Sequence, residues 1–183
     1  MPHLTAFALS NASAALADRV LLRRWRLSLT HTRKLMQAIA QLGPATAFLI
    51  LAVAAAALPP PPTSPPAPPP APLPAPGAAG GGEAAGLLAL LTALSCVALG
   101  LGAFTHTGFW ANIMDVAPRH AGLLLGVSNT AATLPGILCN LSTGWILEGL
   151  GMPGWTLIFA IACAMELLGV STYLWLASGE VQV

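Results

Sequence analysis

Residues 107–136 read TGFWANIMDVAPRHAGLLLGVSNTAATLPG, and the fold class follows from this segment. An apolar run leads into a short polar segment, and a second apolar run rich in small residues comes after it. In the polar segment, Asp115 and Arg119 lie on either side of Pro118, between two runs long enough to cross a bilayer. The pattern predicts two membrane helices that turn at the water surface, with a break near Pro118. The G-x-x-x-G spacing that begins at Gly122 lets the second helix approach a neighbour closely.

The composition of the whole chain is that of a membrane protein. Charged residues make up 7% of its 183 residues and the mean hydropathy is +0.76, whereas soluble domains carry about 25% charged residues. A spanning helix needs roughly 20 apolar residues, and the runs that meet or approach this length are 2–17, 35–58, 87–110, 121–147 and 155–177. The first of them is a little short. The predicted fold class is an all-α polytopic membrane protein with about five transmembrane helices.

The chain divides into three parts. Residues 1–58 hold two transmembrane helices joined by a basic loop at 19–34. Residues 59–86 are rich in Pro, Ala and Gly and lack core-forming side chains, so we expect a disordered outer loop. Residues 87–183 hold three transmembrane helices and a short cytoplasmic tail.

The positive charges predict the orientation, because Lys and Arg accumulate on the cytoplasmic side of membrane proteins. If the loop at 19–34 is cytoplasmic, the turn at 111–120 and the tail are cytoplasmic as well. All 7 Lys and Arg of the chain then lie on that side. The loop at 59–86, which has no Lys or Arg, then faces outward.

Several classes of site and partner are not expected. The formal net charge is +1 and no basic run interleaves with aromatic residues, so we expect no nucleic-acid partner. The 3 cysteines lie inside apolar runs, where buried hydrophobic side chains are expected rather than a disulfide or a metal site. The chain has no H-E-x-x-H, G-x-S-x-G or paired-Asp motif, so we do not expect an enzyme, a metal or a cofactor.

A long motif runs through the polar turn and the helix after it. Its members are Asn112, Asp115, Val116, Ala117, Pro118, Arg119, Ala121, Gly122, Gly126, Ser128, Asn129, Thr133 and Gly136. This motif resembles the pattern N-x-x-D-[IV]-A-P-R-x-A-G-x-x-x-G-x-S-N-x-x-x-T-x-x-G of the anion-transporter branch of the major facilitator superfamily. That branch includes sodium/phosphate cotransporters, vesicular glutamate transporters and sialin. Ile113 and Ala132 depart from the pattern, and segments at 18–24, 32–34 and 43–45 also resemble the branch.

The resemblance implies a fold and a function. Members of the branch have twelve helices in two halves, and the matched positions place this chain as helices eight to twelve. We therefore expect a C-terminal fragment or a truncated gene model. The implied function is part of a secondary active transporter for inorganic phosphate or organic anions, coupled to sodium or protons and working by alternating access. The alternative is a non-transporting membrane interaction protein, a stand-alone five-helix fragment that associates with a full-length relative.

The resemblance also implies the partners. They are the lipid bilayer, a small anion with sodium or a proton, and the missing N-terminal half of the transporter. It leaves the membrane open between plasma membrane, vesicle and plastid.

Polar side chains within the spans are candidates for the substrate pathway, because ionisable and polar groups in hydrocarbon are costly. The candidates are Asn112, Ser128, Asn129, Thr133 and His106. The resemblance favours Ser128 and Asn129 as cavity-lining residues, and hydrogen bonding between helices is the alternative. His106 either relays protons or has a structural role.

Charges near the ends of the spans are candidates for a cytoplasmic gate. We expect Asp18, Asp115 and Arg119 to act there, with a charge pair between Asp18 and Arg119 at the membrane surface. Solvated surface charge is the alternative. Glu166 is a carboxylate well inside a span, and it either takes a proton, faces a cavity or lies at the outer rim of the last helix.

The charge distribution predicts opposite exposure of the two long loops. In a variant without the 3 native cysteines, single cysteines introduced at 19–34 and at 59–86 are treated with a membrane-impermeant thiol reagent. In intact, uniformly oriented vesicles we expect one loop to react at once and the other only after the vesicles are opened. Equal labelling of both loops in intact vesicles contradicts this orientation.

Overall fold

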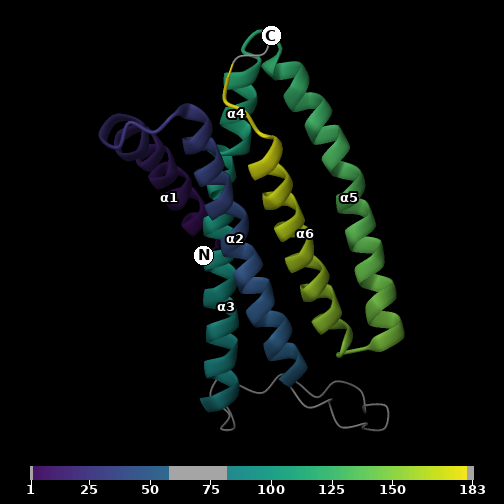
Figure 1. Cartoon of the computed structure of the whole chain (residues 1–183). Helices are drawn as coiled ribbons and strands as arrows, with labels where there is room; N and C mark the ends of the chain where they lie inside the picture. The colour runs from purple at the N-terminus through teal and green to yellow at the C-terminus, as the bar shows by residue number, and fades with distance from the viewer. Residues whose placement is uncertain (1, 58–81, 181–183) are drawn as a thin grey trace, which may run out of the picture.

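The computed structural model of the chain describes residues 2–57 and 82–180 (Figure 1). These residues form helices in the order α1 (Pro2–Ala15), η1 (Leu16–Arg24), α2 (Leu29–Ala57), α3 (Gly82–Gly102), η2 (Ala103–His106), α4 (Phe109–Val116), α5 (Ala121–Leu150) and α6 (Gly154–Leu176). No strand is present among the described residues. The predicted all-α membrane class is confirmed.

Four helical stretches are long and apolar enough to cross a membrane: Leu29–Ala57, Ala89–Val116, Ala121–Leu150 and Gly154–Leu176. Four of the predicted spans overlap these stretches. The first predicted span is different, because the 14 residues of α1 extend only about 21 Å, less than the roughly 30 Å of hydrocarbon in a bilayer. It continues into η1, a wider π-helical segment that carries Asp18 and several arginines.

Helix α3 starts earlier than the third predicted span, at Gly82 rather than at residue 87. Of the predicted outer loop at 59–86, residues 59–81 lie outside the described part of the chain, and residues 82–86 belong to α3. Glutamate and alanine have high helix propensity, and the sequence has Glu83 followed by two alanines. These local preferences extend the helix into the end of the predicted loop.

α2 is the centre of the bundle. It packs most extensively against α6 and also against α3, while α1 packs against α3. The buried cluster lies where η1, α2 and η2 meet, and consists of Ala17, Leu21, Met36, Ala40 and Phe104. Close packing of α2 on α3 depends on Gly43, where an added Cβ would lie 2.5 Å from Leu101 Cδ1.

The span that contains α3 and α4 is interrupted near its end. α3 gives way to the 3₁₀ turn η2, and α4 starts only at Phe109. Gly108 lies at the break, where an added Cβ would be 2.8 Å from the backbone nitrogen of Gln37 in α2. Because real Cβ atoms do not approach a backbone atom this closely, glycine is required for the contact.

α5 is the least packed of the long helices. None of its residues is buried, and Figure 1 shows it meeting α4 at one end and α6 at the other while its middle stands apart. The turn from Ala117 to His120 precedes it, in agreement with the predicted break near Pro118. Gly151 follows it with a φ of 61°, which favours glycine. The predicted close approach at Gly122 is not made, because a Cβ added there would have no atom of another described helix within 4 Å.

These contacts predict different effects for two glycine substitutions. Gly108→Ala forces a methyl group against α2, and we expect it to lower the free energy of unfolding by about 1–3 kcal/mol. Gly122→Ala adds the same methyl group in open space on a helix, and we expect a change within about 0.5 kcal/mol. The measurement is reversible unfolding of the purified chain in bicelles, and equal stabilities for the two variants contradict the close approach at Gly108.

Candidate functional site

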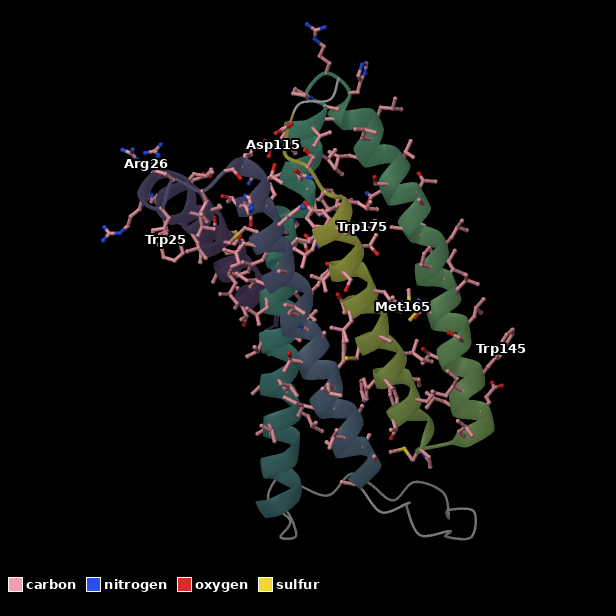
Figure 2. All side chains as sticks on the ribbon, viewed as in Figure 1. Trp25, Arg26, Asp115, Trp145, Met165 and Trp175 are labelled. Atoms are coloured by element: carbon pink, nitrogen blue, oxygen red, sulfur yellow. The ribbon has the colours of Figure 1, made fainter. Side chains whose placement is uncertain are left out.

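An ion pair joins the start of α2 to the end of α4. Arg33 Nε donates to Asp115 Oδ2 at 2.6 Å, and Arg33 Nη1 donates to the carbonyl oxygen of Thr107 at 3.0 Å. The two charged side chains are 12% and 22% exposed, so water screens them less than it screens a surface pair. Figure 2 labels Asp115 beside the start of α2. The guanidinium of Arg33 therefore binds both the carboxylate at the end of α4 and the backbone just before α4 begins.

Side chains from neighbouring helices form hydrogen bonds with the backbone groups at the break in the span. Gln37 Oε1 accepts a hydrogen bond from the Phe109 backbone N–H at 3.0 Å. Tyr173 of α6 donates its hydroxyl to the Gly108 carbonyl oxygen at 3.4 Å. Interrupted backbone at membrane depth must find such partners, because hydrocarbon offers none. The hydrogen bonds fix α4 between α2 and α6.

A groove with a volume of about 580 Å³ lies beside this network, between α2, α4 and α6. Its polar lining residues are Gln37, Gln41, Asn112, Thr172 and Tyr173, and the rest of its lining is apolar. None of the residues that line it carries a charge. The Oδ1 atom of Asn112, a residue that is only 8% exposed, has no hydrogen-bond partner in the described chain, nor has the Oε1 atom of Gln41. The groove thus offers polar groups without charge.

The predicted substrate-pathway residues are divided between the groove and α5. Asn112 lines the groove. On α5, Ser128 is half-buried, while Asn129 and Thr133 are exposed, with the Thr133 hydroxyl donating to the Asn129 carbonyl at 3.0 Å. His106 is exposed at the end of η2. Of these five residues, Asn112 alone contributes to the groove, so the structure does not gather them into one site.

The predicted gate residues are arranged differently from the expectation. Asp115 pairs with Arg33, whereas Asp18 in η1 and Arg119 in the turn after α4 are both exposed and form no ion pair with a described residue. The expected pair between Asp18 and Arg119 is therefore not made in this structure. Arg119 follows Pro118 in an exposed turn, where its guanidinium stays in contact with water. The role of these residues in gating remains a prediction.

Arg33, Gln37, Gln41 and Tyr173 were not among the predicted site residues. Arg33, Gln37 and Gln41 are spaced four apart, so they follow one face of α2. This row of polar residues continues into the apolar part of the helix, and the sequence alone could have revealed it. Tyr173 gives no such signal, because an aromatic residue near the end of a span is typical of the membrane interface.

Comparison with known proteins gives the family. No family model matches the chain. It is 31% identical over 182 residues to the ascorbate transporter, chloroplastic, of Arabidopsis thaliana, an alignment that covers 98% of this chain and 27% of that protein. It is 36% identical over 149 residues to probable anion transporter 7 of Oryza sativa subsp. japonica, covering 81% of this chain and 27% of the relative. It is 35% identical over 94 residues to sialin of Ovis aries, covering 51% of this chain and 19% of the relative.

The chain spans about a quarter of the length of the relatives that match nearly all of it, at 27% and 24%. Its apolar helices and these relatives make it a multi-pass integral membrane protein. The relatives are named as transporters and not as enzymes. The chain belongs to the anion-transporter branch of the major facilitator superfamily.

Proposed function

We propose that the chain is the C-terminal part of a secondary active transporter for inorganic phosphate or organic anions, coupled to sodium or protons. The observation that carries the proposal is similarity over 98% of the chain to two proteins, one named as an ascorbate transporter and the other as a probable anion transporter. Its partners are the lipid bilayer, the anion with its coupling ion, and an N-terminal half that supplies the remaining helices. Transport then proceeds by alternating access, in which the two halves rock about a central site.

The ion pair between Arg33 and Asp115 is the element that gates the cytoplasmic end. It holds α4 against α2, and the break at Thr107 and Gly108 lets α4 move as a short separate segment. Separating the pair frees α4 and the turn after it, which carries Arg119. In this proposal Asp18 and Arg119 are exposed because their partners lie on the other half of the transporter.

The anion is recognised mainly outside this chain. The groove between α2, α4 and α6 has no charged lining residue, and Arg33 is occupied by Asp115. An anion in a membrane site requires a cation or several hydrogen-bond donors. We therefore assign the charge recognition to the N-terminal half, and hydrogen-bonding contacts to Ser128, Asn129 and Thr133 on the uncovered helix α5.

A membrane interaction protein without transport activity is the second candidate. It is favoured by α5, which has no buried residue and exposes a row of large apolar side chains such as Leu134, Leu138 and Leu141. In that case α5 would pack against a full-length relative rather than against a missing half of its own transporter.

Reconstitution distinguishes the two candidates. We expect no uptake of phosphate or an organic anion by liposomes that hold the 183-residue chain alone, because half of the alternating-access unit is absent. Co-reconstitution with the first seven helices of a full-length relative should restore saturable, gradient-driven uptake. Uptake by the chain alone contradicts the proposal, and lack of uptake in both cases favours the interaction protein.

The ion pair predicts a coupled pair of substitutions. We expect Arg33→Gln and Asp115→Asn each to lower the free energy of unfolding by about 1–3 kcal/mol, because each leaves a partly buried charge without its partner. The double variant should lose less than the sum of the two single effects.

The matched control repeats the same comparison with Arg119→Gln in place of Arg33→Gln, alone and combined with Asp115→Asn. Arg119 is exposed and unpaired in the described chain, so its effect should be within about 0.5 kcal/mol and additive with that of Asp115→Asn. Additive effects for Arg33 and Asp115, measured by reversible unfolding in bicelles, remove the pair from the proposed gate.

A further inference from the structure

Glu166 is an acidic side chain near the middle of a membrane-spanning helix. It lies in α6 and is half-buried. The other acidic residues of the four described spans, Asp115 and Glu148, lie close to the ends of their helices. A carboxylate at this depth is costly in hydrocarbon, so such a residue is a functional-site hypothesis by default.

The side of α6 that carries Glu166 faces α2. Cys163 and Val170 lie three positions before and four positions after Glu166, on the same side of the helix, and both are buried. Phe159, two turns before Glu166, stacks on Phe48 of α2 with ring centroids 6.4 Å apart. Glu166 therefore lies on the side of α6 that packs against α2.

No cation faces Glu166 in the part of the chain that the structure describes. α2 has no titratable residue from 35 to 57, and the titratable residues of α5 are Cys139 and Glu148. On α6 itself they are Cys163 and Tyr173. The nearest cations on α2 are Arg33 and Lys34 at its start, and the first of these is bound to Asp115. The charged form of Glu166 has no counter-ion here, whereas the neutral acid requires none.

The polar groove leads from the gate to the level of Glu166. At one end it is lined by Gln37 and Tyr173, which belong to the network around Arg33. At the other end it is lined by Met165 and Gly169, one position before and three positions after Glu166 on α6, while Glu166 itself lies next to the groove and not in its lining. The Gln41 amide also lines this part, with its Nε2 atom 2.5 Å from the position of a Cβ added at Gly169. The amide and hydroxyl groups that line the groove can bind the waters that carry a proton along it.

We propose that Glu166 is a proton-binding site within the membrane, and that the groove between α2, α4 and α6 connects it to the cytoplasmic side. The carboxylate takes up one proton from water in the groove and becomes a neutral acid, and it returns that proton to water when it ionises. As a role in transport the inference rests on the proposed function, since it makes protons rather than sodium the coupling ion. Proton binding itself does not depend on transport.

Carbodiimide labelling tests the site in the full chain reconstituted in liposomes. Dicyclohexylcarbodiimide, which partitions into the bilayer, adds to a protonated carboxyl group and leaves a stable N-acylurea that mass spectrometry locates. At neutral pH we expect an adduct on Glu166 at least about tenfold more abundant than on the exposed Glu148, because an ordinary glutamate is almost fully ionised at that pH. The adduct should decline at alkaline pH and be lost in Glu166→Gln. Equal labelling of Glu166 and Glu148 overturns the proposal.

A matched pair of α6 variants tests the groove. Thr172 lines the groove and Ser171 does not, although both are exposed and both bond the backbone of the preceding turn. Thr172→Phe should place a ring in the groove and slow hydrogen–deuterium exchange of the Glu166 acid severalfold, as measured by the shift of its infrared C=O band in D₂O. Ser171→Phe should leave the exchange rate unchanged.

Equal exchange rates in the two variants overturn the groove as the proton path. Glu166→Gln identifies the infrared band, because the band disappears in that variant. Neither assay uses an anion or an ion gradient, so a failure of the proposed transport function and a failure of the proton site give different results.

Discussion

The interruption of the spanning stretch Ala89–Val116 is the constraint on which the arrangement of the helices depends. A helix inside a bilayer pairs its backbone N–H and C=O groups with one another. Any break in the helix leaves some of these donors and acceptors unpaired, and hydrocarbon cannot bind them. Here the break at Thr107 and Gly108 is closed by Arg33, Gln37 and Tyr173. These side chains come from the beginning of α2 and the end of α6, so both helices are fixed to α4 at the same depth. The absence of a side chain at Gly108 brings the backbones close enough for these bonds to form.

Polar groups in α5 also need hydrogen-bond partners within the membrane, but they find them inside their own helix rather than on neighbouring helices. Several of the polar side chains of α5 bond to the backbone of their own helix, as Thr130 does to Gly126 and Asn140 to Gly136. These side chains need no partner on another helix for those bonds, and α5 contacts α4 and α6 mainly near its ends. A helix of this kind can be covered by lipid or by another part of a transporter without a change in its internal hydrogen bonding.

The sequence predicted the features that depend on local physics. Hydropathy identified the four spanning stretches, although it also suggested a first span at 2–17, and the missing N–H of Pro118 located the break before α5. The start of α3 was missed because proline and glycine dominate the predicted loop, while the helix-favouring residues at its end are few. The close approach predicted at Gly122 is not made by any described neighbour.

The candidate site depended on tertiary contacts that one sequence does not specify. Arg33 and Asp115 are 82 positions apart, and charge alone could equally pair Asp115 with other arginines of the basic loop. The prediction of a pair between Asp18 and Arg119 relied on charge and on their position at span ends, and it did not account for the exposed turn that carries Arg119. The four-residue spacing from Arg33 to Gln41 marks a polar face of α2, although it does not name the partners of that face.

The arginines around η1 have a consequence for the surrounding lipid. Arg19, Arg23, Arg24 and Arg26 are exposed, and Figure 2 shows Trp25 and Arg26 turned away from the bundle. Anionic headgroups attract each such cation by about 1 kcal/mol, and the attraction is screened as salt rises. An indole ring beside these charges is suited to the headgroup layer. The segment that leads into α2 is therefore held more firmly against a leaflet rich in phosphatidylserine than against a neutral one, which makes headgroup composition a variable of the protein's stability.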